Sequence, residues 1–359
     1  MLSGKLNDRT GNMQSHQYQP LRFTGNGGEY FRIWIVNLCL SIVTFGIYSG
    51  WAKVRRNQYF YRHTYLANAN FDYHGNPIAI LKGRIFAFVL FAAYSITIRS
   101  DLIEGLIVLV VIMLIMPWLL VSSLRFRLHN TSYRGLRFSF HGETGEAYIS
   151  MLLWPLFSFF TLGMLWPFAH QRIASYMREN SVYGNVFFKF AAGVRRFYKL
   201  YGVVLLITIV NVFIAMTITR VMIRSGALHI AGEKVYMVNV AVGISALWAY
   251  IGLLLVVAPY FISRMQNLLW NQTKLGSHIF TSEARARELF VIMLGNVVLI
   301  TLTLGLFKPF ADIRLARYRL ERIGILLDGD IDQFTSGLQG EVAAIGEEVA
   351  DMFDVDIAL

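Results

Sequence analysis

The sequence predicts an all-α polytopic membrane protein with four spanning helices, three recurring broken-helix segments and pseudo-threefold packing. Three observations lead to this fold class. First, 55% of the 359 residues are hydrophobic and 15% are charged, whereas about 25% of the residues of a soluble domain are charged. Second, the apolar residues gather in long runs. Third, one motif occurs three times along the chain.

The apolar runs define seven segments that could enter a bilayer. They are residues 30–52, 84–98, 102–124, 147–169, 200–219, 235–262 and 289–311. A spanning helix needs about 20 apolar residues. We therefore expect two antiparallel spanning pairs, formed by segments 84–98 with 102–124 and 200–219 with 235–262.

The other three segments share a motif of the form Glu-x14-Thr-x-Gly-x5-Ala-x2-Arg-x3-Tyr. Its copies align without gaps at offsets of 117 and 259 residues. The recurring residues are Glu29, Glu146 and Glu288; Thr44, Thr161 and Thr303; Gly46, Gly163 and Gly305; Arg55, Arg172 and Arg314; and Tyr59, Tyr176 and Tyr318. A chance origin explains three such copies poorly, so the motif indicates an internal repeat.

The motif glycine lies inside an apolar run and predicts a break in each segment. Glycine frees the backbone there, and a break inside a membrane requires cover by protein or water. If all seven segments spanned in series, 18 basic residues would lie inside and 14 outside. If the three motif segments are hairpins entering from the cytoplasm, the counts become 28 and 4. Because basic residues favour the cytoplasmic side, we expect hairpins that re-enter or lie in the interface, and cytoplasmic termini.

The predicted organisation alternates hairpins with spanning pairs. It comprises a polar N-terminal tail (1–20), a first repeat (21–75), a spanning pair (78–124), a second repeat (138–190), a spanning pair (200–262), a third repeat (280–330) and an acidic C-terminal tail (331–359). The polar tail contains no apolar signal-peptide core.

The first copy of the motif reads Gly-x-Glu29-Tyr-Phe, then Asn37, then Thr44-x-Gly-Ile-Tyr-x-x-Trp-Ala-x-x-Arg55. In these residues the chain resembles the YjgN family, over about residues 20–330. This resemblance implies a bacterial inner-membrane protein built around a domain of unknown function, without an established activity. One departure is Gly50, where the family pattern has proline; we expect a less kinked turn at this position.

The recurring glutamates, arginines, threonines and glycines are the candidate site residues. Each glutamate begins a segment, where a carboxylate compensates the helix dipole. A hairpin also returns its end to its beginning, so salt bridges Glu29–Arg55, Glu146–Arg172 and Glu288–Arg314 are the second hypothesis. Asn37, Asn211 and Asn296 lie in apolar runs, where interhelical hydrogen bonds are expected. The sequence shows no catalytic motif, metal-ligand spacing or cofactor fingerprint, which favours a protein that is not an enzyme and has no cofactor.

The charge is divided between a basic body and an acidic tail. Residues 1–322 carry +20, and the last 37 residues carry −9. We expect the body to meet anionic lipid at the cytoplasmic face and not nucleic acid. The tail predicts an amphipathic helix that docks on the basic face or binds a protein partner.

These features predict an integral inner-membrane protein. The leading hypothesis is a transporter or channel for a small solute or lipid, with its path along the threefold axis. The alternative is a non-transporting scaffold that organises lipid or partner proteins. If the hairpins only lie in the interface and brace the bundle, the scaffold hypothesis is favoured.

Overall fold

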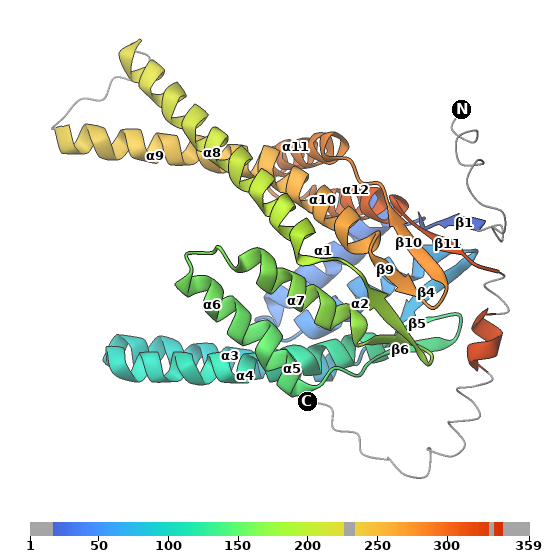
Figure 1. The fold of residues 1–359 in the computed structure, drawn as a ribbon. Coiled ribbons are helices and arrows are strands. Elements are labelled where there is room, and N and C mark those ends of the chain that lie inside the picture. The colour runs from blue at the N-terminus through green and yellow to red at the C-terminus, as the bar shows by residue number, and fades with distance from the viewer. Residues whose placement is uncertain (1–16, 226–233, 330–333, 340–359) are drawn as a thin grey trace, which may run out of the picture.

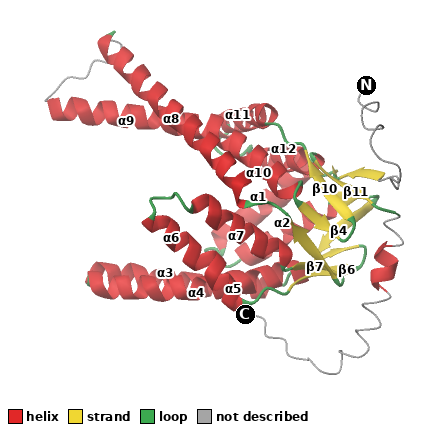
Figure 2. Cartoon of the chain, viewed as in Figure 1, coloured by secondary structure: helices red, strands yellow, loops and turns green. Residues whose placement is uncertain are grey.

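The computed structural model describes residues 17–225, 234–329 and 334–339, and this part of the chain contains one antiparallel sheet of eleven strands. The strand order is β1-β11-β10-β9-β8-β7-β6-β5-β4-β3-β2. β1 (Gln17–Pro20) pairs with β11 (Ile323–Leu327), whereas β2 (Arg22–Phe23) pairs with β3 (Thr64–Leu66). Because only Leu21 separates β1 from β2, this stretch joins the two ends of the sheet. The sheet curls into a nearly closed barrel (Figure 2).

The prediction of an all-α fold is therefore wrong. The remaining strands are β4 (Ala69–Tyr73), β5 (Thr131–Tyr133), β6 (Leu136–Phe140), β7 (Ser181–Tyr183), β8 (Val186–Phe190), β9 (Thr273–Leu275) and β10 (His278–Ser282). They are only three to five residues long, too short for their alternation to stand out beside the apolar runs. They lie in stretches that were predicted to be connections.

The helices form five hairpins in the described part of the chain. They are α1 (Gly27–Val43) with α2 (Ser49–Arg62); α3 (Pro77–Ser100) with α4 (Leu102–His129); α5 (Thr144–Tyr148), the π-helical turn η1 (Ile149–Leu153) and α6 (Trp154–Phe160) with α7 (Trp166–Glu179); α8 (Val194–Arg224) with α9 (Lys234–Gly252), the π-helical turn η2 (Leu253–Val257) and α10 (Ala258–Trp270); and α11 (Ala286–Leu302) with α12 (Lys308–Glu321). Each hairpin connects two adjacent, antiparallel strands. All five therefore leave the same rim of the barrel, and Figure 1 shows the long pairs α3/α4 and α8/α9 extending furthest from the strands.

Contacts between neighbouring hairpins close a ring. α2 contacts α3, α4 contacts α5, α7 contacts α8, α10 contacts α11, and α12 contacts α1. The predicted pseudo-threefold packing is wrong, because each of the two long pairs stands between two motif hairpins, whereas the contact of α12 with α1 puts two motif hairpins side by side. Strand pairing gives both kinds of hairpin equivalent places on the barrel.

A hydrogen bond at the base of each hairpin ties its last residue to its first. The donors are the backbone N–H groups of Thr24, His74, His141, Ala191 and Glu283, and the acceptors are the carbonyls of His63, Asn130, Asn180, Gln272 and Arg322. Another common feature is a buried residue 14 positions before the strand that ends the hairpin: Gly50, Pro117, Pro167, Pro259 or Pro309. All five hairpins thus share the hydrogen bond at the base and the position of this buried residue in the returning helix.

Four helices in the described part of the chain are long and apolar enough to cross a membrane. They cover Pro77–Ser100, Leu102–His129, Val194–Arg224 and Asn239–Trp270, and at most 17% of each apolar window is buried within the protein. Such exposure of apolar side chains is expected of a helix that lies in lipid. These helices correspond to the four spanning segments predicted from the sequence.

Candidate functional site

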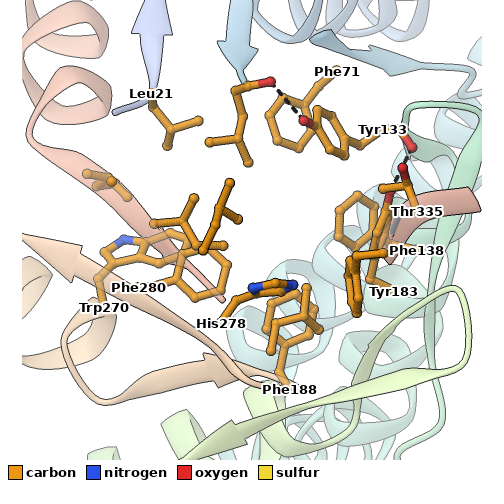
Figure 3. Close-up of a pocket in the computed structure, with 17 residues that line it drawn as sticks. Leu21, Phe71, Tyr133, Phe138, Tyr183, Phe188, Trp270, His278, Phe280 and Thr335 are labelled. Atoms are coloured by element: carbon orange, nitrogen blue, oxygen red, sulfur yellow. Dashed lines mark hydrogen bonds between the residues drawn. The ribbon is translucent and has the colours of Figure 1, made fainter. Parts of the chain in front are cut away.

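The barrel interior contains a ring of stacked aromatic side chains. Phe71, Phe138, Phe188 and Phe280 come from every second strand, β4, β6, β8 and β10 (Figure 3). Consecutive ring centroids lie 6.5, 6.5 and 6.0 Å apart, with interplanar angles of 22°, 22° and 29°. Leu21 lines the same space from the strand that closes the barrel, and so takes the fifth place in this phenylalanine ring.

A second layer of side chains comes from the intervening strands. It consists of Leu66, Tyr133, Tyr183, Leu275 and Ile325, all of them buried. The hydroxyl of Tyr133 donates to the carbonyl of Leu66 at 2.7 Å, and that of Tyr183 donates to the carbonyl of Tyr133 at 3.0 Å. Burial raises the pKa of both tyrosines, so they stay protonated and keep donating. Because these hydroxyls are bound to the backbone, the layer presents apolar surface to the interior.

Between the two layers lies a cavity of about 140 Å³. The interior of an eight-stranded barrel is just wide enough for side chains to fill, and additional strands widen it. Here the wider barrel leaves space next to Leu21, Trp270 and His278. Its walls are almost entirely hydrocarbon, which suits an apolar group and excludes ions.

The mouth of the barrel that faces away from the hairpins is covered by the helical turn 334–339. Phe334 packs edge-on against His278 with a centroid distance of 4.5 Å, and Leu338 is buried in the barrel core. The side-chain amide of Gln339 donates to the carbonyl of Arg134 at 2.8 Å. This turn, hereafter the C-terminal plug, closes the cavity on that side. The predicted acidic amphipathic helix lies beyond it, in residues outside the described part of the chain.

The motif threonines and glycines shape the tips of three hairpins. Gly46, Gly163 and Gly305 have φ of +90°, +83° and +93°, and the residues before them have φ near +50°. Each threonine accepts a hydrogen bond from the N–H four residues later: Tyr48 to Thr44 at 3.0 Å, Leu165 to Thr161 at 3.3 Å, and Phe307 to Thr303 at 2.9 Å. The residue at the apex is almost fully exposed: Phe45 at 98%, Leu162 at 96% and Leu304 at 95%.

The predicted Glu–Arg salt bridges are not formed. Among the described residues, the ion pairs of Glu288 are with Arg322 at 2.8 Å and Arg285 at 3.5 Å. No ion pair joins Glu29 to Arg55 or Glu146 to Arg172, in the same part of the chain. Arg55 and Arg172 instead lie over the rings of Tyr48 and Phe168, and Arg314 lies beside Gly295. Each motif arginine lies part-way along the second helix of its hairpin. It is therefore further from the barrel than the motif glutamate, which lies in the first turn of the first helix.

The motif tyrosines join the two ends of each hairpin. Tyr59, Tyr176 and Tyr318 donate to the carbonyls of Asn26, Glu143 and Arg285 at 2.8–2.9 Å. The hydroxyls of Tyr59 and Tyr318 also accept from the N–H of Asn26 and Arg285. These contacts, hereafter the tyrosine latches, were not predicted, because the recurring charges indicated salt bridges as the link between the two ends of a hairpin. The predicted interhelical asparagine bonds exist for Asn211 to Ala249 and Asn296 to Ala311.

A family model described as bacterial protein of unknown function (DUF898) matches residues 18–352. The chain belongs to this family. Curated relatives of this DUF898 protein are named inner membrane protein YjgN, which confirms the resemblance predicted from the motif. The relative from Salmonella typhimurium is 29% identical over 42% of the chain and 38% of its own length. The relative from Escherichia coli K12 is 30% identical over 33% of the chain and 30% of its own length.

The match thus spans about a third of the length of the curated relatives. No solved structure matches this DUF898 chain. The names of the relatives and the four long apolar helices agree on a protein integrated in the bacterial inner membrane.

Proposed function

We propose that this DUF898 protein moves lipid between the leaflets of the inner membrane, without a catalytic step. The carrying observation is that three of its hairpins are too short to span and end in exposed apolar tips. Each long pair has a short hairpin on either side in the ring, so that the bilayer beside the short hairpins would be thinner than the bilayer beside the long pairs.

The lengths of the helices support this proposal. At 1.5 Å per residue, α1 and α12 are about 26 and 21 Å long and α4 is about 42 Å, against a hydrocarbon thickness of about 30 Å. From Arg314 back to its first residue Lys308, α12 covers about 9 Å, and the turn that carries Leu304 lies beyond it. With the charged arginine at the interface, the apex lies within the hydrocarbon layer.

The basic residues orient the protein. In the hairpin topology, 28 of them lie on the side of the barrel and 4 at the far ends of the long pairs. This asymmetry favours a cytoplasmic barrel and cytoplasmic termini. Arginines at the bases of the short hairpins, such as Arg62, Arg285 and Arg322, then lie where they attract anionic headgroups.

The short hairpins would deform the bilayer. Apolar segments shorter than the hydrocarbon thickness are accommodated by local thinning of the bilayer. A thinner bilayer shortens the path over which a headgroup crosses hydrocarbon. The apolar filling of the barrel favours lipid over a small polar solute as the transported molecule, because it offers no wetted path.

The test is a bleaching assay on vesicles that contain the full chain and a headgroup-labelled fluorescent phosphatidylglycerol in both leaflets. A reductant that cannot cross the membrane bleaches only the outer leaflet unless lipid exchanges. We expect the wild-type protein to bring the inner-leaflet label to the reductant. The combined variant Phe45→Ser, Leu162→Ser and Leu304→Ser removes the apolar tips without touching packed residues, and should slow this exchange at least tenfold.

A matched control replaces an exposed aromatic residue away from the tips. Phe187→Ser, on the outer face of β8, should leave lipid exchange unchanged, since this side chain is half exposed on the barrel. Equal exchange in the wild type, the tip variant and protein-free vesicles would refute the proposal.

A second candidate, a scaffold for partner proteins, is favoured by the C-terminal plug. The plug lies at the mouth of the barrel, away from the hairpins, and the acidic residues follow it in the sequence. Truncation after Gln339 would then abolish association with a partner and leave lipid exchange unaffected, whereas loss of exchange on truncation would count against this candidate.

A further inference from the structure

We propose that the barrel cavity is a binding site for a benzene-sized apolar group, either a small monocyclic aromatic molecule or the end of a hydrocarbon chain. The site lies next to Leu21, where the phenylalanine ring lacks its fifth aromatic side chain (Figure 3). The proposal is independent of lipid exchange by the hairpins, because it concerns the barrel alone.

The size of the cavity matches such a group. An engineered apolar cavity of about 150 Å³, lined by leucine, isoleucine and phenylalanine, stays dry and binds benzene. The barrel cavity measures about 140 Å³ and has walls of the same chemistry. Protein interiors are close-packed, and an unfilled space of this size forfeits dispersion contacts around its whole lining.

The walls present aromatic surface from several directions. Three successive pairs in the phenylalanine ring are stacked, and Trp270 packs on Phe280 with a centroid distance of 5.2 Å. Aromatic groups prefer offset-stacked or edge-to-face partners 4.5–7 Å away. A planar guest at the fifth position therefore continues the stacking that the four phenylalanines begin.

Three polar atoms beside the cavity are bound to the protein. The hydroxyls of Tyr133 and Tyr183 donate to backbone carbonyls, and the imidazole Nδ1 of His278 accepts from the N–H of Asp328 at 3.1 Å. A guest therefore gains hydrocarbon contact and does not have to satisfy these groups. This selects an apolar guest over one that carries hydrogen-bonding groups.

The first experiment measures binding of fluorobenzene to the full chain in lipid nanodiscs by ¹⁹F relaxation. Leu21→Phe supplies the missing ring and fills part of the cavity. Leu21→Ile keeps the volume of the side chain and serves as the matched control. Because all three samples share the same bilayer, partitioning of the probe into lipid cancels between them. We expect saturable binding to the wild type and to Leu21→Ile, and at least tenfold weaker binding to Leu21→Phe.

A second measurement distinguishes the two sources of the guest. Lipids with a diazirine at the chain end are photolysed in the same nanodiscs, and adducts are mapped by mass spectrometry. Adducts on barrel residues 131–140 or 181–190 that Leu21→Phe suppresses identify a lipid chain end. Adducts on the helices alone, together with saturable fluorobenzene binding, identify a small molecule from solution.

Two results would overturn the proposal. One is identical fluorobenzene relaxation for the wild type and a folded Leu21→Phe. The other is the absence of any saturable component in the wild type. If Leu21→Phe does not fold, as judged by circular dichroism, Ile325→Phe takes its place, because Ile325 lines the same cavity from β11.

Discussion

Removing the hydroxyl of a tyrosine latch should release the start of its hairpin, and the effect should differ between hairpins. The Tyr59 hydroxyl donates to the Asn26 carbonyl at 2.9 Å and accepts from the N–H of the same residue at 2.7 Å. The Tyr176 hydroxyl donates to the Glu143 carbonyl at 2.8 Å. Both tyrosine side chains are buried. Tyr59→Phe therefore leaves the N–H of Asn26 without a partner. Tyr176→Phe removes one hydrogen bond but leaves no backbone group unpaired, because the Glu143 carbonyl also accepts from the N–H of Ala147, as the Asn26 carbonyl does from that of Tyr30.

The expected magnitude follows from what each variant loses. A buried polar group left unsatisfied costs about 1–3 kcal/mol, whereas a hydrogen bond whose partners stay satisfied contributes about 0.5–1.5 kcal/mol. Tyr59→Phe, which orphans an N–H, therefore costs about 2 kcal/mol, and Tyr176→Phe costs about 1 kcal/mol. At about 1.4 kcal/mol per factor of ten, local opening becomes about 30-fold and 5-fold more frequent.

Hydrogen–deuterium exchange resolved by peptide measures this opening directly. We expect faster exchange in residues 24–31 of Tyr59→Phe and a smaller effect in residues 141–148 of Tyr176→Phe. Tyr61→Phe, on the same helix as Tyr59, is the control, because the Tyr61 hydroxyl makes no hydrogen bond within the described residues. If Tyr59→Phe and Tyr61→Phe exchange alike, the hydroxyl does not hold the hairpin, and the reasoning fails.

Three further predictions follow from individual contacts. Gly50→Ala should lower the melting temperature, because a Cβ there would lie 2.7 Å from the backbone oxygen of Pro77. The expected loss of folding stability is about 1–3 kcal/mol, and an unchanged melting temperature would contradict it. Thr161→Val should speed amide exchange at Leu165, whose N–H loses its acceptor; unaltered exchange there argues against a role in the turn. Burial, and then the nearby Glu146 carboxylate, raises the pKa of Tyr176 to about 12. Because the folded-state pKa is raised, the contribution of the protonated Tyr176 to stability is complete below pH 10 and is lost as the pH rises towards 12. The difference in tyrosinate absorbance between the wild type and Tyr176→Phe measures this pKa. A titration midpoint near 10 would contradict the prediction.

Local features of the hairpins could be predicted from the sequence. A glycine with positive φ and a threonine that accepts a hydrogen bond from the residue four positions later act within a few residues of chain. Their spacing therefore carries the information needed to predict the turn. The same holds for the spanning helices, whose apolar length is a property of a single segment.

The strands carried a weaker signal that could have been found. Two-residue turns such as Arg134-Gly135, with φ of +49° and +81°, connect short alternating stretches like Phe138-Ser139-Phe140. Turns of this type join antiparallel strands. Among apolar runs of twenty residues or more, five alternating residues count for little, so the strands were interpreted as loops.

By itself, the sequence determined that the chain enters a membrane, where its helices lie and where three of them turn. These properties depend on hydrophobicity and on backbone freedom, which act locally. Only the tertiary structure decided that the hairpins stand on a barrel, because β1 pairs with β11 across some 300 residues of chain. The same holds for the phenylalanine ring: its members lie far apart in sequence, and strand register alone brings them around one cavity.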